Sequence, residues 1–477
     1  MWRRITILSL LCGAAWADSY TGEGWTVRFN RPDQTTTYSS IGDDEYVIRE
    51  AFLARIDALA SNDWACLATY TFSGNTAQLG AAGPILAAMS NALVRGAKLG
   101  FVADKDVNIA SNYWPGISLT GLSTRAGNRL TLSRAPDDWG IMHDKVGVFW
   151  YRAATQAWVL SASWNFTGGA SSYQWNILAE IQNNDLAAAY SNEMREMLSG
   201  RFHANPAKSH AHDGARFRLA DTNMWTNGWV RFGPYPDGTV GGSNALTDVT
   251  NAIDAATDEI VFALNKLTRT NVVEALIRAC DRGVLVNGTI PKSDRLPGGD
   301  SYGTWQMLAN PANYATANRA FLYDAYSSAA RTNYDAGEAD LTHAKYMAID
   351  PRGEHPLVIH GSANWTASAL VATNENDENV LFLPHRGMAH AFVAQFNAMT
   401  DGTIPWCGLR SGGSSAVSRL SYWLPYTTAY EVVHATNVFD LSAWTNFVQS
   451  LPSGRGTNTV TVTNRAERGF YRVRPVP

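Results

Sequence analysis

Residues 343–350 read His343-Ala344-Lys345-Tyr346-Met347-Ala348-Ile349-Asp350, and Gly361-Ser362-Ala363-Asn364-Trp365-Thr366 follows shortly after. The first half of the chain carries the same pattern, with His143-Asp144-Lys145 followed by Ser163-Trp164-Asn165-Phe166-Thr167. Because the 477 residues include only ten His and seven Lys, about 0.15 His-x-Lys match is expected by chance. Two matches, each about twenty residues before a Ser-x-Asn-x-Thr segment, therefore indicate an internal duplication.

Weaker echoes extend this duplication toward the N-terminal side of each motif. Gly24-Trp25-Thr26-Val27-Arg28-Phe29 with Pro32 is matched by Gly228-Trp229-Val230-Arg231-Phe232 with Pro234. In each half the apolar spacing then predicts a helix, a strand, a second helix that ends on Arg-Gly, and another strand. The expected helices are 46–59, 84–94, 249–256 and 272–280, and the expected strands are 64–72, 97–103, 259–264 and 284–290.

Alternating strands and helices predict two homologous α/β lobes with mixed sheets. We place the first lobe at 18–200, a connector at 201–227 and the second lobe at 228–407. The connector contains His203, His210 and His212 beside Asp213, and an exposed polar linker is favoured over a metal site. Residues 408–477 begin with a Gly/Ser-rich spacer and contain strand-like runs, which predicts a small β-rich C-terminal module.

The first 17 residues are typical of a signal peptide. Arg3 and Arg4 precede an apolar run, and Ala15-Trp16-Ala17 fits a cleavage site. Because Leu11 stands before Cys12 in place of a small residue, release is favoured over a lipid anchor. We therefore expect a secreted or periplasmic protein, without a transmembrane segment since no later run reaches 18 apolar residues.

Composition narrows the class of protein. Hydrophobic residues make up 45% and charged residues 17%, as in a folded domain. The formal charge of −4 gives no overall attraction for nucleic acid or anionic membranes, although a local basic cleft is not excluded. Downstream of the signal peptide, Cys66, Cys280 and Cys407 allow at most one internal disulfide, and buried core cysteines are favoured.

The duplicated motifs suit the binding of a phosphate group. If 142–150 and 344–349 are strands, His143 and Lys145 share one face, since alternate residues of a strand point the same way. Ser163 and Asn165 would share a face of the following strand. An isolated His-x-Lys is more simply explained by a core histidine beside a surface lysine. The duplication in register reverses that preference, because two such faces would surround one phosphate with two Lys and two His.

These residues resemble the phospholipase D superfamily, whose signature is H-x-K-x4-D. The second copy fits with His343, Lys345 and Asp350, and Asn376-Asp377-Glu378-Asn379 extends the similarity. The first copy departs from it. Trp150 replaces the Asp, Ala162 replaces the Gly before Ser163, and Trp175 is aligned with Glu378.

The resemblance implies the two-lobed phospholipase D fold with a pseudo-two-fold axis, and a reaction without metal or cofactor. His143 would be the nucleophile that forms a phosphohistidine, and His343 the general acid and base, although the sequence itself does not order them. Lys145 and Lys345 would stabilise the charged oxygens. The remaining expected site residues are phosphate contacts at Ser163, Asn165, Ser362 and Asn364, and supports at Asp350 and Glu378.

The leading hypothesis is an exported, monomeric enzyme that hydrolyses phospholipids to phosphatidate and a free head group. The aromatic segments Tyr113-Trp114-Pro115 and Tyr302 to Trp305 fit an apolar entrance or, equally, ordinary packing. A secreted nuclease of the same superfamily is the alternative, with nucleic acid as its substrate. A catalytically weakened phosphodiester-binding protein is a third hypothesis, supported by Trp150. A cardiolipin-synthase-like transferase is less favoured, because the chain lacks the N-terminal membrane helices usual for those enzymes.

Overall fold

The computed structural model describes residues 19–30, 46–74, 80–113, 116–138, 140–172, 174–203, 208–316, 318–323 and 341–400. It also describes the backbone of the strands between residues 408 and 475. The expected signal peptide and Cys407 lie outside the described residues.

The first lobe is built on an eight-stranded mixed sheet in the order β1-β2-β9-β7-β6-β3-β4-β5. The pairs β3–β4 and β4–β5 are parallel, whereas the other neighbours are antiparallel. The strands of this sheet are β1 (Ser19–Gly22), β2 (Trp25–Phe29), β3 (Trp64–Thr69), β4 (Lys98–Ala103), β5 (Leu130–Arg134), β6 (Lys145–Tyr151), β7 (Gln156–Ala162) and β9 (Ile177–Gln182). The helices are α1 (Val47–Asp57), α2 (Ala82–Val94), α3 (Leu119–Ala126), α4 (Gly168–Ser172) and α5 (Asn184–Leu198).

The second lobe repeats this topology strand for strand, in the order β10-β11-β18-β17-β16-β12-β13-β14. Its parallel pairs, β12–β13 and β13–β14, occupy the same places as those of the first sheet. The strands are β10 (Arg216–Phe217), β11 (Gly228–Gly233), β12 (Glu259–Leu264), β13 (Leu285–Thr289), β14 (Phe321–Leu322), β16 (Lys345–Ile349), β17 (Leu357–Gly361) and β18 (Glu378–Leu383). The helices are α6 (Ala245–Ala255), α7 (Thr270–Asp281), α8 (Lys292–Arg295), α9 (Tyr302–Ala309), α10 (Ala367–Leu370) and α11 (Arg386–Met399). Two homologous α/β lobes with mixed sheets are thereby confirmed.

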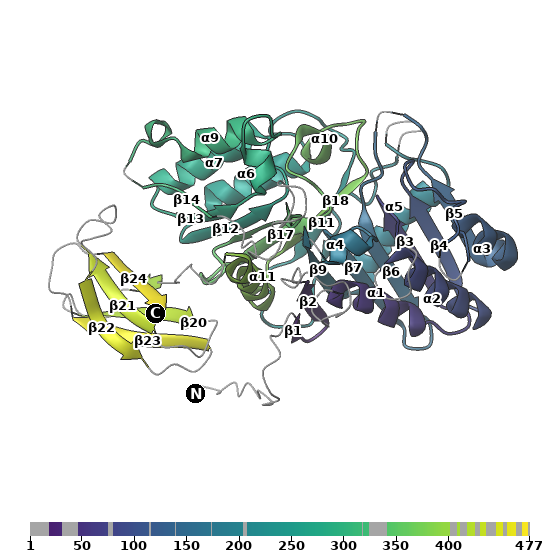
Figure 1. Cartoon of the computed structure of the whole chain (residues 1–477), viewed down its shortest axis with the longest axis horizontal. Coiled ribbons are helices and arrows are strands. Elements are labelled where there is room, and N and C mark those ends of the chain that lie inside the picture. The colour runs from purple at the N-terminus through teal and green to yellow at the C-terminus, as the bar shows by residue number, and fades with distance from the viewer. Residues whose placement is uncertain are drawn as a thin grey trace, which may run out of the picture.

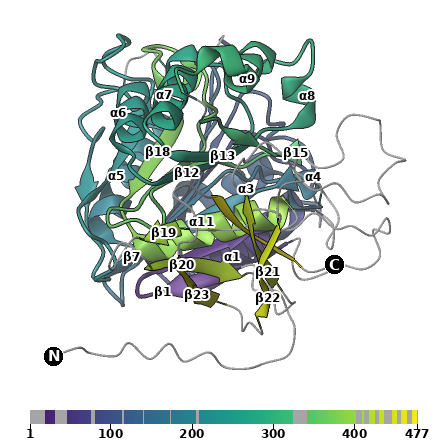
Figure 2. The same ribbon diagram turned by 90° about the vertical axis from the view of Figure 1, so that its left-hand side faces the viewer.

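The two lobes share one hydrophobic core. The largest buried cluster contains residues of both sheets together with α5 and α11. Each of these helices reaches across: α5 also contacts β10, and α11 also contacts β1 and β2. The second lobe, in teal, lies beside the blue first lobe in Figure 1, and Figure 2 shows α6 and α7 at the opposite end of the molecule from α1. The outer helices cover two separate clusters, one in each lobe.

The Arg-Gly pairs end α2 and α7 as the sequence predicts. Gly96 and Gly283 have φ angles of +95° and +94°, which a residue without a side chain adopts at little cost. The preceding arginines tie the helix pairs together, since Arg95 donates to the Ile56 carbonyl at the end of α1 and Arg282 to the Ile253 carbonyl in α6.

In the described part of residues 408–475, six strands form two three-stranded sheets, which confirms the β-rich character of the C-terminal residues. Cys66 and Cys280 are buried and unpaired, as expected for core cysteines. Within the described ranges, no helix combines the length and apolar character needed to cross a membrane. The six strands are β19 (Gly408–Arg410), β20 (Val417–Leu424), β21 (Tyr430–Ala435), β22 (Thr445–Leu451), β23 (Gly456–Thr463) and β24 (Phe470–Pro475).

Candidate active site

The two His-x-Lys motifs lie at the beginning of equivalent strands. β6 begins at Lys145 and β16 at Lys345, so both histidines precede their strands. The strand expected at 142–150 begins three residues later than predicted, so the expectation that His143 lies within it is wrong. The strand expected at 344–349 begins one residue later, and His343 precedes it as expected. Likewise, β7 ends at Ala162 and β17 at Gly361, so each Ser-x-Asn pair follows its strand. The histidine segments leave their own sheet and bond to the other lobe, whereas Ser163 and Ser362 donate their N–H groups to Ile177 and Asn379 of their own lobe.

Backbone hydrogen bonds cross between the lobes at both histidines. The N–H of His143 donates to the Asp377 carbonyl at 2.9 Å, and that of His343 donates to the Trp175 carbonyl at 3.1 Å. The flanking residues extend each crossing, through a bridge between Met142 and Asp377 and through the parallel pairing of β15 (Leu341–Thr342) with β8 (Gln174–Trp175). The two motifs, 200 residues apart in the sequence, thus meet at one centre.

Each imidazole is oriented by a side chain of the opposite lobe. The Nδ1 atom of His143 lies 2.8 Å from Oε1 of Glu378, and Nδ1 of His343 lies 2.9 Å from Oδ1 of Asn176. Asn176 therefore occupies the place of Glu378, and the sequence alignment of Trp175 with Glu378 is wrong by one residue. One histidine faces a carboxyl group and the other an amide.

The two motif serines support these partners. Ser362 donates to Glu378 at 2.6 Å and accepts the Asn379 N–H, whereas Ser163 donates to Asn176 at 2.8 Å and accepts the Ile177 N–H. A serine hydroxyl has a single proton. That proton is used behind the histidines in both lobes, and direct contact of the serines with a phosphate stays a prediction.

The motif asparagines contrast with the serines. Within the described residues, the Oδ1 atoms of Asn165 and Asn364 are buried and have no hydrogen-bond partner. Buried polar atoms are rarely left unpaired in a folded protein. Two unpaired amides at equivalent positions, each two residues after a motif serine, are consistent with groups that pair with a ligand.

The motif lysines are fully buried beside their histidines. Lys145 donates to the carbonyl of His143 at 2.8 Å, and Lys345 donates to that of His343 at 2.9 Å. Burial lowers the pKa of Lys145 to about 8, although Glu378 and Asp144 oppose this effect. Burial and the nearby ammonium of Lys145 bring the pKa of Lys345 well below its usual value. The two ammonium groups repel each other, which favours an anion between them.

Electrostatics keep both imidazoles neutral. Burial, followed by the ammonium groups of Lys145 and Lys345, holds the pKa of His143 well below its usual value. The same causes hold the pKa of His343 low. Burial raises the pKa of Glu378 to about 7, against the effect of Lys145. When Glu378 is ionised, the proton of neutral His143 lies on Nδ1, so Nε2 carries the free lone pair.

The sequence analysis missed two residues of this centre, Tyr70 and Lys266. The Tyr70 ring lies edge-to-face with the His143 imidazole, with 4.9 Å between centroids, and the Lys145 ammonium lies 5.4 Å from the Tyr70 centroid. Lys266 pairs with Asp300 and acts electrostatically on His143. Neither belongs to a recognisable motif. Their position in the sequence could have identified them, because each lies just after a strand that pairs with a motif lysine, β3 or β12.

The Trp150 substitution moves a support without removing it. Asp350 follows β16 with a φ of +43° and accepts the backbone N–H groups of residues 257, 258 and 259. Trp150 instead continues β6 and donates its indole N–H to Ser191 on α5. In this lobe Asp63, just before β3, provides the matching link, since it accepts the Arg152 N–H at 2.8 Å. In the first lobe the supporting carboxylate therefore comes from the residue before β3, whereas in the second lobe it comes from the residue after β16.

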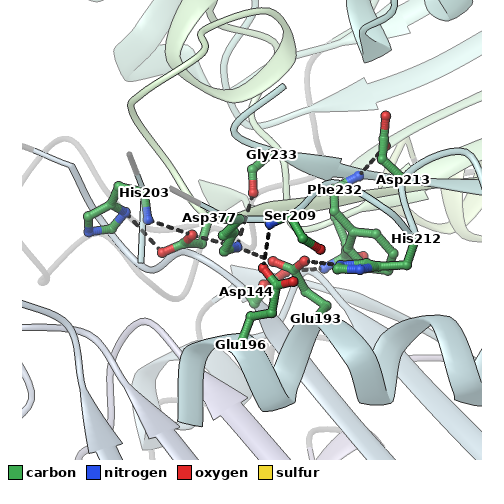
Figure 3. Close-up of polar contacts among 12 residues, drawn as sticks. Asp144, Glu193, Glu196, His203, Ser209, His212, Asp213, Phe232, Gly233 and Asp377 are labelled. Carbon is green, nitrogen blue, oxygen red and sulfur yellow. Dashed lines mark hydrogen bonds and ion pairs between the residues drawn. The ribbon is translucent and has the colours of Figure 1, made fainter. Parts of the chain in front are cut away.

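The connector is partly buried against this site, which corrects the expected exposed linker. His203 pairs with Asp377 at 2.9 Å, and His212 pairs with Glu193 at 2.5 Å. The two residues are 2% and 8% exposed. Figure 3 shows them at either side of a cluster of acidic groups. Among the described residues, no three His, Cys, Asp or Glu side chains are grouped to hold a metal ion.

Comparison with solved structures finds the same fold at low sequence identity. Phosphatidylserine synthase of Haemophilus influenzae matches with a TM-score of 0.50 and 11% identity, over 75% of this chain and 84% of that one. Polyphosphate kinase of Porphyromonas gingivalis matches at 0.46 and 13%, over 78% of this chain but only 50% of that one. Yeast tyrosyl-DNA phosphodiesterase matches at 0.42 and 11%, over 76% and 90%. These likenesses concern the fold alone.

Comparison of the sequence with family models identifies the family. No curated protein matches the sequence significantly. The model described as "Cardiolipin synthase, PLD-like domain" matches residues 58–198 and 249–400, which is more than half of the chain and includes both motifs. The chain therefore belongs to the phospholipase D-like family.

Proposed function

We propose that this protein is an exported phosphodiesterase that hydrolyses phospholipids to phosphatidate and a free head group, with a phosphohistidine on His143 as intermediate. The observation that carries the proposal is the pair of crossed contacts, His143 with Glu378 and His343 with Asn176. Two neutral imidazoles with opposed partners and two buried lysines are the groups that an in-line displacement at phosphorus requires.

The partners of the two histidines support the assignment of roles. When Nε2 of His143 attacks phosphorus, the ring gains positive charge, and a carboxylate at Nδ1 stabilises that charge. The P–O bond to the head group breaks, and the departing oxygen takes a proton from His343. The neutral amide of Asn176 holds an imidazolium less firmly than a carboxylate would, which favours proton release. Water then gives a proton to His343 and attacks phosphorus, and the N–P bond breaks.

A bound phosphodiester also prepares His343 for its role as an acid. Its negative charge would lie between Lys145 and Lys345, whose ammonium groups hold the pKa of the histidine low. Offsetting that repulsion raises the affinity of His343 for a proton. The empty site keeps its histidines neutral, and the substrate itself promotes the protonated acid.

Phospholipid and nucleic acid are separated by a direct assay. The purified protein is incubated with phosphatidylcholine vesicles and with plasmid DNA, without divalent metal, beside His143→Ala and His343→Ala variants. His355→Ala is the matched control, because His355 is an exposed histidine of the second lobe. We expect choline release that both active-site variants lose and the control keeps.

The other outcomes select the alternatives. Nicking of DNA without choline release would favour a nuclease, against which the net charge of −4 argues. Activity on neither substrate would favour a phosphodiester-binding protein. Export is tested separately, by N-terminal sequencing of the protein recovered outside the cytoplasm, with cleavage expected after Ala17.

A further inference from the structure

A cluster of buried charges, drawn in Figure 3, adjoins the candidate active site, since the carbonyl of Asp377 accepts the His143 N–H. It contains three carboxylates, Asp144, Glu193 and Asp377, and one ammonium, that of Lys208, and all four residues are at least 95% buried. None takes part in the reaction proposed above. Two of them adjoin its groups in sequence, however, because Asp144 lies between His143 and Lys145 and Asp377 precedes Glu378.

Lys208 joins three segments of the chain at this cluster. The residue belongs to the connector, and its ammonium pairs with Glu193 on α5 of the first lobe. The same ammonium lies 2.6 Å from Oδ1 of Asp377, just before β18 of the second lobe, and 3.3 Å from the carbonyl of Gly233 at the end of β11. One residue of the connector therefore contacts both lobes.

Asp377 transmits this contact to the nucleophile. Its carbonyl accepts the His143 N–H at 2.9 Å, and its own N–H donates to the Ile141 carbonyl at 2.9 Å. The next residue, Glu378, makes the 2.8 Å contact with Nδ1 of His143. A shift of Asp377 would therefore move both the backbone and the side-chain partner of His143 at once.

Charge balance in the cluster depends on Lys208. Burial tends to raise the pKa of Asp377, but Lys208 and His203 outweigh it and bring that pKa below its usual value. Burial and Glu193 raise the pKa of Asp144 to about 7, against the effect of Lys208. Without the ammonium, three buried carboxylates would repel one another. The titratable groups that surround Lys208 are Asp144, Glu193, Glu196, His203, His210, His212 and Asp377.

We propose that Lys208 is a positioning residue for the nucleophile: its ammonium holds Asp377 in place across the lobe interface and thereby sets the contact between Glu378 and His143. This inference rests on the proposed role of His143. A surface cavity of about 290 Å³ opens beside His212, which contacts Glu193 of the cluster.

The test replaces Lys208 by methionine, which removes the charge and keeps a similar shape, with Lys98→Met as the control at an exposed lysine. We expect kcat to fall about 10²-fold, as for a displaced catalytic group. We also expect the ratio of Lys208→Met to wild-type activity to rise as the pH falls from about 8 to about 6. Asp144, whose pKa is about 7, then takes up a proton, which offsets part of the lost positive charge. A ratio that does not depend on pH would contradict the proposal.

A second variant, Lys208→Met with Asp377→Asn, removes both partners of the ion pair. Activity should recover at least about tenfold over Lys208→Met, since coupled residues are not additive. Equal or lower activity would overturn the proposal. If Lys208→Met does not fold, the double variant is compared with the wild type. Activity within about tenfold of the wild type then supports the proposal, and a larger loss refutes it.

A readout without substrate separates this inference from the proposed function. The ¹⁵N signals of the His143 ring, identified by their loss in His143→Gln, should shift in Lys208→Met and return in the double variant. If they do so while the wild type cleaves no phosphodiester, the positioning role stands and the substrate is wrong. If the wild type is active and the signals do not move, the positioning role is wrong.

Discussion

The two motif histidines occupy equivalent places in two equivalent lobes, yet they face partners of different charge. His143 contacts the carboxyl group of Glu378, and His343 contacts the amide of Asn176, at almost equal distances. The serines that donate to these partners match in the two lobes, and so do the backbone bonds of the two histidines to the opposite lobe. Duplication has preserved the geometry of the site, whereas the charge beside each histidine depends on one side chain contributed by the other half.

The largest expected effect is a difference between the two histidine variants in how they release a leaving group. On a phosphodiester with p-nitrophenol as leaving group, which needs no proton to depart, His343→Ala should release a burst of one p-nitrophenol per protein and then turn over slowly. His143→Ala should show no burst and lose at least about 10⁴-fold in rate. Rapid-mixing absorbance measures both. A burst in His143→Ala alone would mean that the roles are reversed.

A smaller effect is expected from the carboxyl partner. Because the pKa of Glu378 is raised to about 7 by burial, protonation below this pH removes its negative charge beside His143, so kcat/KM should fall toward acid. Loss of the Lys145 charge above its pKa of about 8 should give the alkaline limb. Glu378→Gln should abolish the acid limb and lower the plateau about 10²-fold. Asn176→Asp, the matched change in the other lobe, should keep the acid limb.

The smallest effect concerns stability and compares the two supporting carboxylates, Asp350 of the second lobe and Asp63 of the first. Asp350→Asn keeps one acceptor oxygen but weakens bonds to three backbone N–H groups, and should cost about 1–3 kcal/mol in free energy of unfolding. Asp63→Asn affects fewer bonds and should cost about 1 kcal/mol. Denaturant titrations measure both. Trp150→Asp should destabilise the lobe, because Asp63 already provides the link. A gain in stability would contradict this explanation of Trp150.

Much of the fold could be predicted from local signals. β12 runs from Glu259 to Leu264 as expected, and the Arg-Gly pairs end α2 and α7. These features depend on side-chain periodicity and on glycine at a positive φ angle, both of which are written in neighbouring residues. The predictions failed where contacts with residues distant in the sequence, and not adjacent residues, decide where an element begins. The two motif strands begin three residues and one residue later than expected, because His143 and His343 bond to the other lobe.

The buried part of the connector shows the same limit. A polar segment with three histidines and few apolar residues predicts exposure. Lys208 and His212 are nevertheless buried, and they pair with acidic side chains, Lys208 with one from each lobe. Tyr70 and Lys266 were missed for a related reason, since only the pairing of β3 and β12 with the motif strands brings them to the site.

The sequence by itself determined the duplication, the two lobes and the pair of His-x-Lys motifs, because a repeated spacing of rare residues is visible without any coordinates. Only the tertiary structure decided which side chain faces each histidine, that Asn176 stands in the place of Glu378, and that Lys208 lies behind the site. These contacts join residues up to 235 positions apart across a lobe interface, and such distances are set by packing of the whole core.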